Sequence, residues 1–237
     1  MSKFFVVILI ISLSLVSCQT SINSEKILSN SVRFHGGLNA MKNTKGLSFK
    51  KETISYDSTG VMTGLLLQTF IYDFMATTAL LSWEQGTDLW QVSKEKEVWK
   101  LQKGSEYFQI SPAQEKAFEA TLNGGLYVYW QPYKLFTDRA RKTYTGTTML
   151  QGKKAFVIEV YYENSEDLWT YYFDVNNFRL VANRVNHKGR YSLIINDSTE
   201  DISSFSLAKT RTSYRVNAQN EILFKQASYQ YDIIEGH

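Results

Sequence analysis

The side chains that could do acid–base, nucleophilic or metal chemistry are few in this chain and far apart in its sequence. Among 237 residues there are only three histidines and one cysteine. His35 stands beside Gly36-Gly37 at the end of an expected helix, His187 lies at a strand end, and His237 is the last residue. One cysteine forms no internal disulfide and no cysteine-rich zinc site, and separated histidines make no ligand set. We therefore predict no metal, no cofactor and no catalytic residue.

The carboxylates show no acid–base pair in the sequence either. Glu159 falls in an alternating strand and is expected to face solvent, opposite Ile158 and Val160. Asp197 and Asp201 fall in turn-like stretches, where an aspartate bonds its own backbone. No G-x-S-x-G, H-E-x-x-H, P-loop or G-x-G-x-x-G pattern occurs. We expect a protein that is not an enzyme; a polar cleft invisible in the sequence is the alternative.

The composition describes a folded globular chain. Apolar residues make up 43%, charged residues 21%, and the net charge is +3, which excludes disordered, collagen-like and coiled-coil classes. Basic and acidic residues are interspersed, so the one-sided basic surface that binds phosphate backbones is missing and we expect no nucleic-acid partner.

The one cysteine stands at the end of a leader-like segment. Lys3 precedes an apolar run from Phe4 to Leu15 that is too short to span a membrane, as in a secretory signal. Leu15-Val16-Ser17-Cys18 resembles the lipobox of bacterial lipoproteins. The resemblance implies that residues 1–17 are removed and that acyl chains on Cys18 anchor the protein in a lipid bilayer. The alternative is an uncleaved anchor in which Cys18 stands by chance.

The segment after Cys18 predicts the membrane. Gln19 and Thr20 follow the cysteine, so the acidic residue that the enterobacterial rule associates with inner-membrane retention is absent. We expect an outer-membrane lipoprotein that faces the periplasm. Residues 18–23 form a short polar tether, and residues 24–237 form a single domain, expected to be monomeric.

Residues 24–237 are dominated by hairpins. Runs of β-branched and aromatic residues separated by turn residues predict about eleven antiparallel strands. The predicted strands span residues 46–57, 61–74, 77–84, 89–92, 98–101, 139–150, 154–162, 168–174, 179–187, 205–217 and 221–233. Both phases of 61–74 are largely apolar, so this strand is expected to be covered on much of both faces.

Two helical regions interrupt the strands. One helix opens at Ser24 and ends at Gly36-Gly37. Ser111, Pro112 and Gln114 form a capping box that predicts a second helix, ending at 123–125 and followed by an aromatic segment interrupted at Pro132. The fold class is mainly β (α+β): an unclosed barrel or curved sheet with an N-terminal helix and a central helical lid.

Large apolar side chains gather on this half-open sheet. Such a sheet either fills its concave face with side chains or encloses one apolar ligand, and the sequence leaves both open. The candidate ligand-binding residues are Phe49, Leu65, Leu67, Trp99, Leu101, Phe156, Ile158, Val160, Trp169, Tyr171 and Phe173.

The combination resembles a known superfamily. The lipobox, the helix, hairpins with Asp88-Leu-Trp-Gln-Val92 and Val98-Trp-Lys-Leu101, the helical insertion, and then Trp169-Thr-Tyr-Tyr-Phe-Asp-Val175 resemble LolA/LolB-like proteins. Phe34-His-Gly-Gly-Leu38 is similar to a lipoprotein family common in Bacteroidetes. The superfamily resemblance implies an unclosed barrel whose cavity takes acyl chains, hence a lipid or lipoprotein acyl chain as ligand and a role in trafficking to the outer membrane. A non-catalytic structural or interaction lipoprotein with a packed core is the alternative.

Overall fold

The computed structural model describes residues 22–163, 165–202 and 205–236. The predicted leader (1–17), Cys18 and most of the predicted tether (18–23) lie outside the described residues. No helix in the described ranges is long and apolar enough to cross a membrane.

The described residues form one large antiparallel sheet and four helices. The helices are α1 (Ser24–Phe34), α2 (Leu38–Asn43), α3 (Pro112–Tyr129) and α4 (Tyr133–Thr137). The strands are β1 (Gly46–Tyr56), β2 (Met62–Asp73), β3 (Thr78–Gln85), β4 (Asp88–Glu95), β5 (Val98–Lys103), β6 (Glu106–Phe108), β7 (Arg141–Leu150), β8 (Lys153–Tyr161), β9 (Leu168–Asp174), β10 (Leu180–His187), β11 (Arg190–Ile202), β12 (Phe205–Val216) and β13 (Ile222–Gly236).

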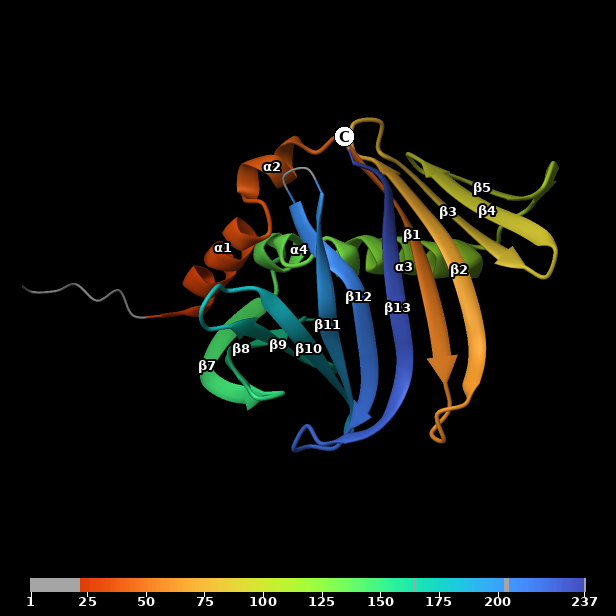
Figure 1. Cartoon of the computed structure of the whole chain (residues 1–237). Coiled ribbons are helices and arrows are strands. Elements are labelled where there is room, and N and C mark those ends of the chain that lie inside the picture. Colours follow the sequence, from red (N-terminus) through yellow and green to blue (C-terminus); the bar gives the residue numbers. More distant parts are fainter. Residues whose placement is uncertain (1–21, 164, 203–204, 237) are drawn as a thin grey trace, which may run out of the picture.

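The sheet is curved and does not close. Its order is β6-β5-β4-β3-β2-β1-β13-β12-β11-β10-β9-β8-β7, so nearly every strand pairs with its neighbour in sequence. The exception is the pairing of β1 with β13, which joins the two halves in the middle of the sheet (Figure 1). Strands β6 and β7 form the free edges. The predicted unclosed, curved, mainly β fold is therefore confirmed.

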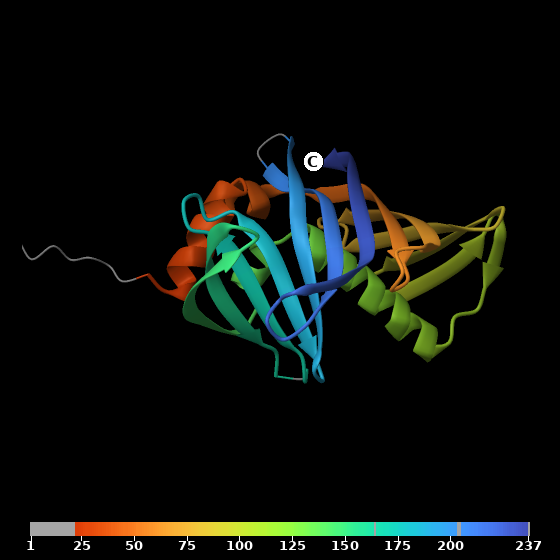
Figure 2. The same cartoon turned by 60° about the horizontal axis from the view of Figure 1, so that its bottom comes forward.

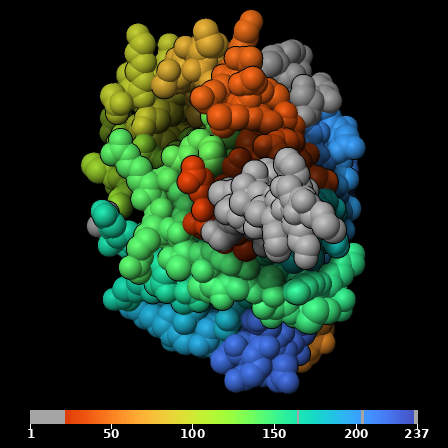
Figure 3. All heavy atoms as spheres, turned by 90° about the vertical axis from the view of Figure 1, so that its left-hand side faces the viewer, coloured from red at the N-terminus to blue at the C-terminus, as the bar shows by residue number. Residues whose placement is uncertain are grey.

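The helices lie on the concave face of the sheet. Helix α3 runs across the strands behind the sheet in Figure 1 and beneath it in Figure 2. Helices α1 and α4 pack on the β7–β9 end of the sheet. In the space-filling view of Figure 3, the surfaces of α1 and α2 (red to orange) adjoin the green α4–β7 region. The concave face is thus covered along most of its width.

Helix α3 begins where its sequence predicts and ends later. Ser111 accepts a hydrogen bond from the backbone of Gln114, whose side chain in turn accepts from the backbone of Ser111, and this reciprocal cap fixes the first turn. The predicted end at 123–125 is wrong, because Gly124 and Gly125 are helical and the helix continues to Tyr129. A Cβ on Gly125 would lie 2.6 Å from Cε1 of Phe70. The missing side chain lets α3 pack directly on β2.

Two strands were not among the eleven that the sequence predicts. Strand β6 is three residues long and exposed. Strand β11 is long, but Asp197 and Asp201, which the sequence places in turns, lie within it. Thr212 on β12 donates a hydrogen bond to Asp197 at 2.7 Å, so this carboxylate is bonded across strands rather than to its own turn. Pairing with β10 and β12 outweighs the local turn preference of the segment.

The concave core has two packed ends. One cluster lies between β1–β5 and α3 and contains Phe49, Phe70, Tyr72 and Tyr129. The other lies between β8–β9 and helices α1 and α4 and is centred on Phe173. Aromatic rings dominate the first cluster: the Phe49 ring centroid lies 4.2 Å from that of Tyr129 and 5.0 Å from that of Phe70. The space between these two ends is where the concave face is not filled.

Candidate functional site

The eleven candidate residues divide into three groups in the structure. Trp169 and Tyr171 line a cavity beneath α3. Seven others lie in or against the two packed cores, with Phe49, Ile158, Val160 and Phe173 completely buried. These seven are Phe49, Trp99, Leu101, Phe156, Ile158, Val160 and Phe173. Leu65 and Leu67 form the third group and lie exposed on the outer face of β2.

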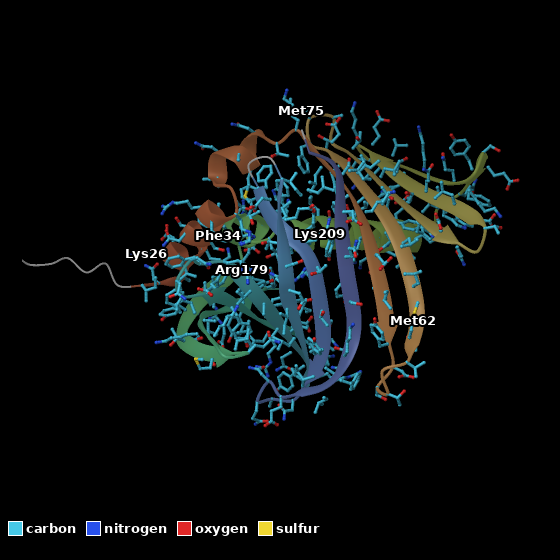
Figure 4. All side chains as sticks on the ribbon, viewed as in Figure 1. Lys26, Phe34, Met62, Met75, Arg179 and Lys209 are labelled. Atoms are coloured by element: carbon cyan, nitrogen blue, oxygen red, sulfur yellow. The ribbon has the colours of Figure 1, made fainter. Side chains whose placement is uncertain are left out.

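Leu65 and Leu67 point away from the concave face. Phe70 on the same strand faces α3, and side chains alternate along a strand, so the odd-numbered positions 65, 67 and 71 face outward. Leu65 is 53% exposed and Leu67 is 41% exposed. The expectation that both faces of this strand are covered is wrong, because α3 covers only one. Met62 and Met75, labelled in Figure 4 near the two ends of β2, are also exposed.

The cavity lies between α3 and strands β9–β13, with β1 at its far side. Its volume is about 500 Å³, within the range of small-molecule sites. Most of its walls are aromatic, aliphatic or glycine. Its lining residues are Lys51, Asn123, Gly124, Tyr127, Val128, Gln131, Tyr162, Trp169, Tyr171, Asn183, Ile194, Arg211, Tyr229 and Tyr231. The concave face is therefore packed at both ends and hollow between them.

A second, smaller space continues the cavity toward β2. It measures about 270 Å³ and shares Lys51, Gly124, Val128 and Tyr231 with the first. The glycine pair of α3 borders it at the point where Phe70 contacts Gly125. The free space beneath α3 is thus elongated, extending from β9 to β2.

A hydrogen-bonded group of phenols and one carboxylate holds α3 at the β8 end of the cavity. Tyr127 donates to Oδ2 of Asp138 at 2.6 Å, and the Tyr127 and Tyr162 hydroxyls lie 2.6 Å apart. Lys142 pairs with Oδ1 of the same aspartate at 2.6 Å. Burial raises the pKa of Tyr162 to about 12 and raises that of Tyr127 beyond it. The phenols stay protonated and act as hydrogen-bond donors that fasten the helix.

Two cations lie on the opposite side of the cavity, and neither has a carboxylate partner among the described residues. Arg211 on β12 is 4% exposed, and its Nη2 donates to Oδ1 of Asn183 at 2.7 Å. Its Nε has no hydrogen-bond partner among the described residues. Lys51 on β1 has its Nζ 5.4 Å from the ring centroid of Tyr229. Burial, together with the charge of Arg211, lowers the pKa of Lys51.

Sequence reasoning missed these polar residues of the cavity. Lys51, Asn183 and Arg211 each look like ordinary positions in an amphipathic strand. They meet only because β1 pairs with β13, β13 with β12, β12 with β11, and β11 with β10. The alternation of side chains along each strand could have identified these residues. Lys51 shares a strand face with Phe49, and Asn183 pairs directly with Tyr171.

His35 lies outside the cavity and connects parts of the fold. His35 ends α1 and is buried, with Nδ1 2.5 Å from the Ser206 carbonyl oxygen and Nε2 accepting from the backbone N–H of Leu180 at 3.4 Å. It joins α1 to β12 and β10 rather than capping its own helix with the ring. Burial lowers its pKa to about 4, so the imidazole is neutral near pH 7. No group of three metal-ligating side chains occurs within the described ranges.

Structural comparison identifies the fold. The chain superimposes on a LolA superfamily protein from Nitrosomonas europaea with a TM-score of 0.53, over 90% of this chain and 92% of that one, at 8% sequence identity. A DUF1329 family protein from Desulfovibrio piger gives 0.47 at 11% identity, covering 88% and 91% of the two chains. An outer-membrane lipoprotein-sorting domain from Vibrio parahaemolyticus gives 0.48 at 10% identity, covering 90% and 91%.

No protein-family model matches the sequence, and no curated protein sequence matches it either. The likeness to the Nitrosomonas protein thus shows a LolA-like fold, as the sequence predicts, at an identity that carries the fold alone.

Proposed function

We propose that this chain is a non-catalytic, membrane-anchored lipoprotein of the outer membrane, facing the periplasm, that binds a lipid or lipoprotein acyl chain beneath α3. The cavity of about 500 Å³ between α3 and β9–β13 carries the proposal. Its walls include Trp169, Tyr171, Val128 and Ile194, and burial of a methylene against such walls is worth about 0.8 kcal/mol. The leader and Cys18 supply the anchor, and the LolA-like fold supports a role in lipid or lipoprotein trafficking.

Among the described residues that line the cavity, no nucleophile is paired with a neighbouring base, which supports binding rather than catalysis. A nucleophile needs a neighbouring base within hydrogen-bond reach, whereas the phenols at the cavity are held in their protonated form. The one carboxylate bonded to them, Asp138, is occupied by Lys142 and the two hydroxyls of Tyr127 and Tyr162. Binding is the activity that these side chains support.

The test is ligand uptake by the chain without its leader and with Cys18→Ala, which retains every helix and strand described. The probe is N-phenyl-1-naphthylamine, a neutral fluorophore, displaced by 1-dodecanol. Ile194→Trp fills the cavity from β11 and should raise the dissociation constant about tenfold or more. The matched control is Leu65→Trp, which places the same ring on the exposed face of β2 and should leave binding unchanged.

Failure takes two recognisable forms. If the wild-type chain takes up no probe and carries no lipid in mass spectra of organic extracts, acyl-chain binding is wrong. The alternative, a structural or interaction lipoprotein, then replaces it, and crosslinking in cells should recover a single stoichiometric partner. If Ile194→Trp and Leu65→Trp reduce uptake equally, binding occurs outside the cavity.

A further inference from the structure

The cavity wall contains two cations, Lys51 and Arg211, although a purely apolar ligand has no group that pairs with a cation. Lys51 and Arg211 line the same space as Val128, Ile194 and Trp169. The chain has 23 aspartates and glutamates, yet none pairs with either cation in the parts of the chain that the structure describes.

The carboxylates on this part of the sheet are already engaged. Glu200 and Asp232 act electrostatically on the nearby Tyr129. Both are paired with Lys209, labelled in Figure 4, at 2.9 Å each. Lys209 therefore has two acidic partners, whereas Arg211, two residues further along the same strand, has none within the described ranges.

An uncompensated guanidinium in a buried position is costly. Arginine cannot lose its proton inside a protein, and a buried charge without an opposite charge costs several kcal/mol unless hydrogen bonds satisfy it. Asn183 accepts one hydrogen bond from Arg211. The guanidinium also lies against the Tyr231 phenol, where it offsets part of the rise in pKa that burial causes. Neither neighbour supplies negative charge.

Lys51 and Arg211 lie where the head group of an amphiphile would lie when its tail occupies the cavity. Lys51 pairs with Tyr231 across β1 and β13, and Tyr229 pairs with Arg211 across β13 and β12. The two cations are thus separated by one strand on the same concave face, with two phenols between them. Lys51 also borders the smaller space that leads toward β2, so apolar walls extend on both sides of the pair.

We propose that Lys51 and Arg211 bind the anionic head of a single-chain amphiphile, a carboxylate or a phosphate monoester, whose apolar tail lies in the cavity beneath α3. This inference rests on the proposed acyl-chain function and specifies its ligand. An anion between the two cations supplies the missing charge and removes their mutual repulsion. Charge-assisted hydrogen bonds of this kind are shorter and about twice as strong as neutral ones.

The experiment compares four amphiphiles that share a dodecyl tail and differ in their head groups. Dodecanoate, dodecyl phosphate, 1-dodecanol and dodecyltrimethylammonium, each below its critical micelle concentration, compete with N-phenyl-1-naphthylamine for the leaderless chain. The two anions should bind about tenfold or more tighter than the alcohol, the fold-change expected of one or two charge-assisted contacts. The stronger of the two anions identifies the head as carboxylate or phosphate.

Single substitutions test whether Lys51 and Arg211 cause the preference for anionic head groups. Lys51→Gln should reduce the anion-to-alcohol affinity ratio about fivefold or more. Lys50→Gln is the matched control, because Lys50 is the exposed neighbour on the other face of β1, and it should preserve the ratio. Arg211→Gln should reduce the ratio further, with its fold checked by circular dichroism.

The outcomes separate the two proposals. If 1-dodecanol or the cationic amphiphile binds as tightly as the anions, or if Lys50→Gln and Lys51→Gln reduce the ratio equally, the anionic-head inference is wrong and acyl-chain binding stands. If no member of the series displaces the probe, acyl-chain binding fails and the head-group inference fails with it.

Discussion

Gly125 of α3 lies directly against the ring of Phe70 on β2. A Cβ at position 125 would meet three ring carbons at 2.6 to 3.1 Å, and Phe70 is 1% exposed and stacked on Phe49, so the ring has nowhere to move. Helix α3 therefore approaches the sheet as closely as its backbone allows at this one point.

Gly125→Ala should for this reason destabilise the protein by about 1–3 kcal/mol, the usual cost of overpacking a core. Gly124→Ala is the control, because among the described residues no atom outside its chain neighbours and its own helix backbone lies within 4 Å of its Cβ position. This variant should be neutral or gain up to about 1 kcal/mol from helix propensity. Urea unfolding followed by circular dichroism measures both. Equal stabilities of the two variants would contradict the close contact.

The division of the candidate apolar residues between core and surface can be tested by truncation. Phe173→Ala removes a ring that is 0% exposed and should cost about 3–5 kcal/mol. Leu67→Ala removes a side chain that is 41% exposed on the outer face and should cost less than about 1 kcal/mol. Thermal unfolding midpoints of the two variants measure the difference. A large loss in Leu67→Ala would mean that another element covers this face.

The phenol group at the end of the cavity should hold α3 in place. Tyr127→Phe deletes the hydroxyl that donates to Asp138, at a cost of about 1–2 kcal/mol. Hydrogen exchange should increase in α3 and remain unchanged in β1–β4. Tyr161→Phe is the control, since its hydroxyl bonds Glu159 at 3.0 Å outside the cavity, and its effect should be below about 0.5 kcal/mol. The assignment fails if α3 exchanges no faster in Tyr127→Phe.

His35 should make stability depend on pH. Its pKa in the folded protein is about 4, below the ordinary 6.5, because the ring is buried. The unfolded chain therefore takes up a proton first, and stability present above pH 6.5 is lost as the pH falls toward 4. The loss amounts to about 3 kcal/mol at most.

His35→Gln removes this contribution. The stability advantage of the wild type over His35→Gln should shrink steadily between pH 7 and pH 4, measured by urea midpoints at several pH values. His187→Gln, at an exposed site on β10, provides the comparison. A wild-type advantage that is constant with pH would show that His35 is already charged in the fold.

The predictable parts of the structure are those encoded by neighbouring residues. Ser111 and Gln114 specify the start of α3, and alternation along β8 and β9 places Ile158 and Tyr171 on one face. Leu65 and Leu67 were misplaced because both phases of their strand are apolar, so periodicity gave no sign of which face α3 covers. Only the position of Phe70 against Gly125 decides it.

The site itself depended on long-range pairing. Ile194 lies on β11, whose aspartates are typical of turns, so the sequence did not predict this strand. Lys51 and Arg211 come together because β1 pairs with β13 of the β12–β13 hairpin, which is distant from β1 in sequence. No local pattern specifies that β13 inserts between β1 and β12. The sequence therefore left open whether the concave face is filled or hollow, and it did not predict the polar residues of the cavity.

The pairing of β1 with β13 also sets the order in which the molecule can assemble. Phe49 pairs with Ile233, so two segments that are far apart in the sequence must meet before the sheet is continuous. Within each half of the sheet, the strands can pair as local hairpins. Pairing β1 with β13 closes a long loop, and forming such a contact is slow. Lys51 stands on one side of this seam and Arg211 on the other. The cavity beneath α3 has its complete wall only after β13 has paired with β1, because Tyr229 and Tyr231 of β13 line it.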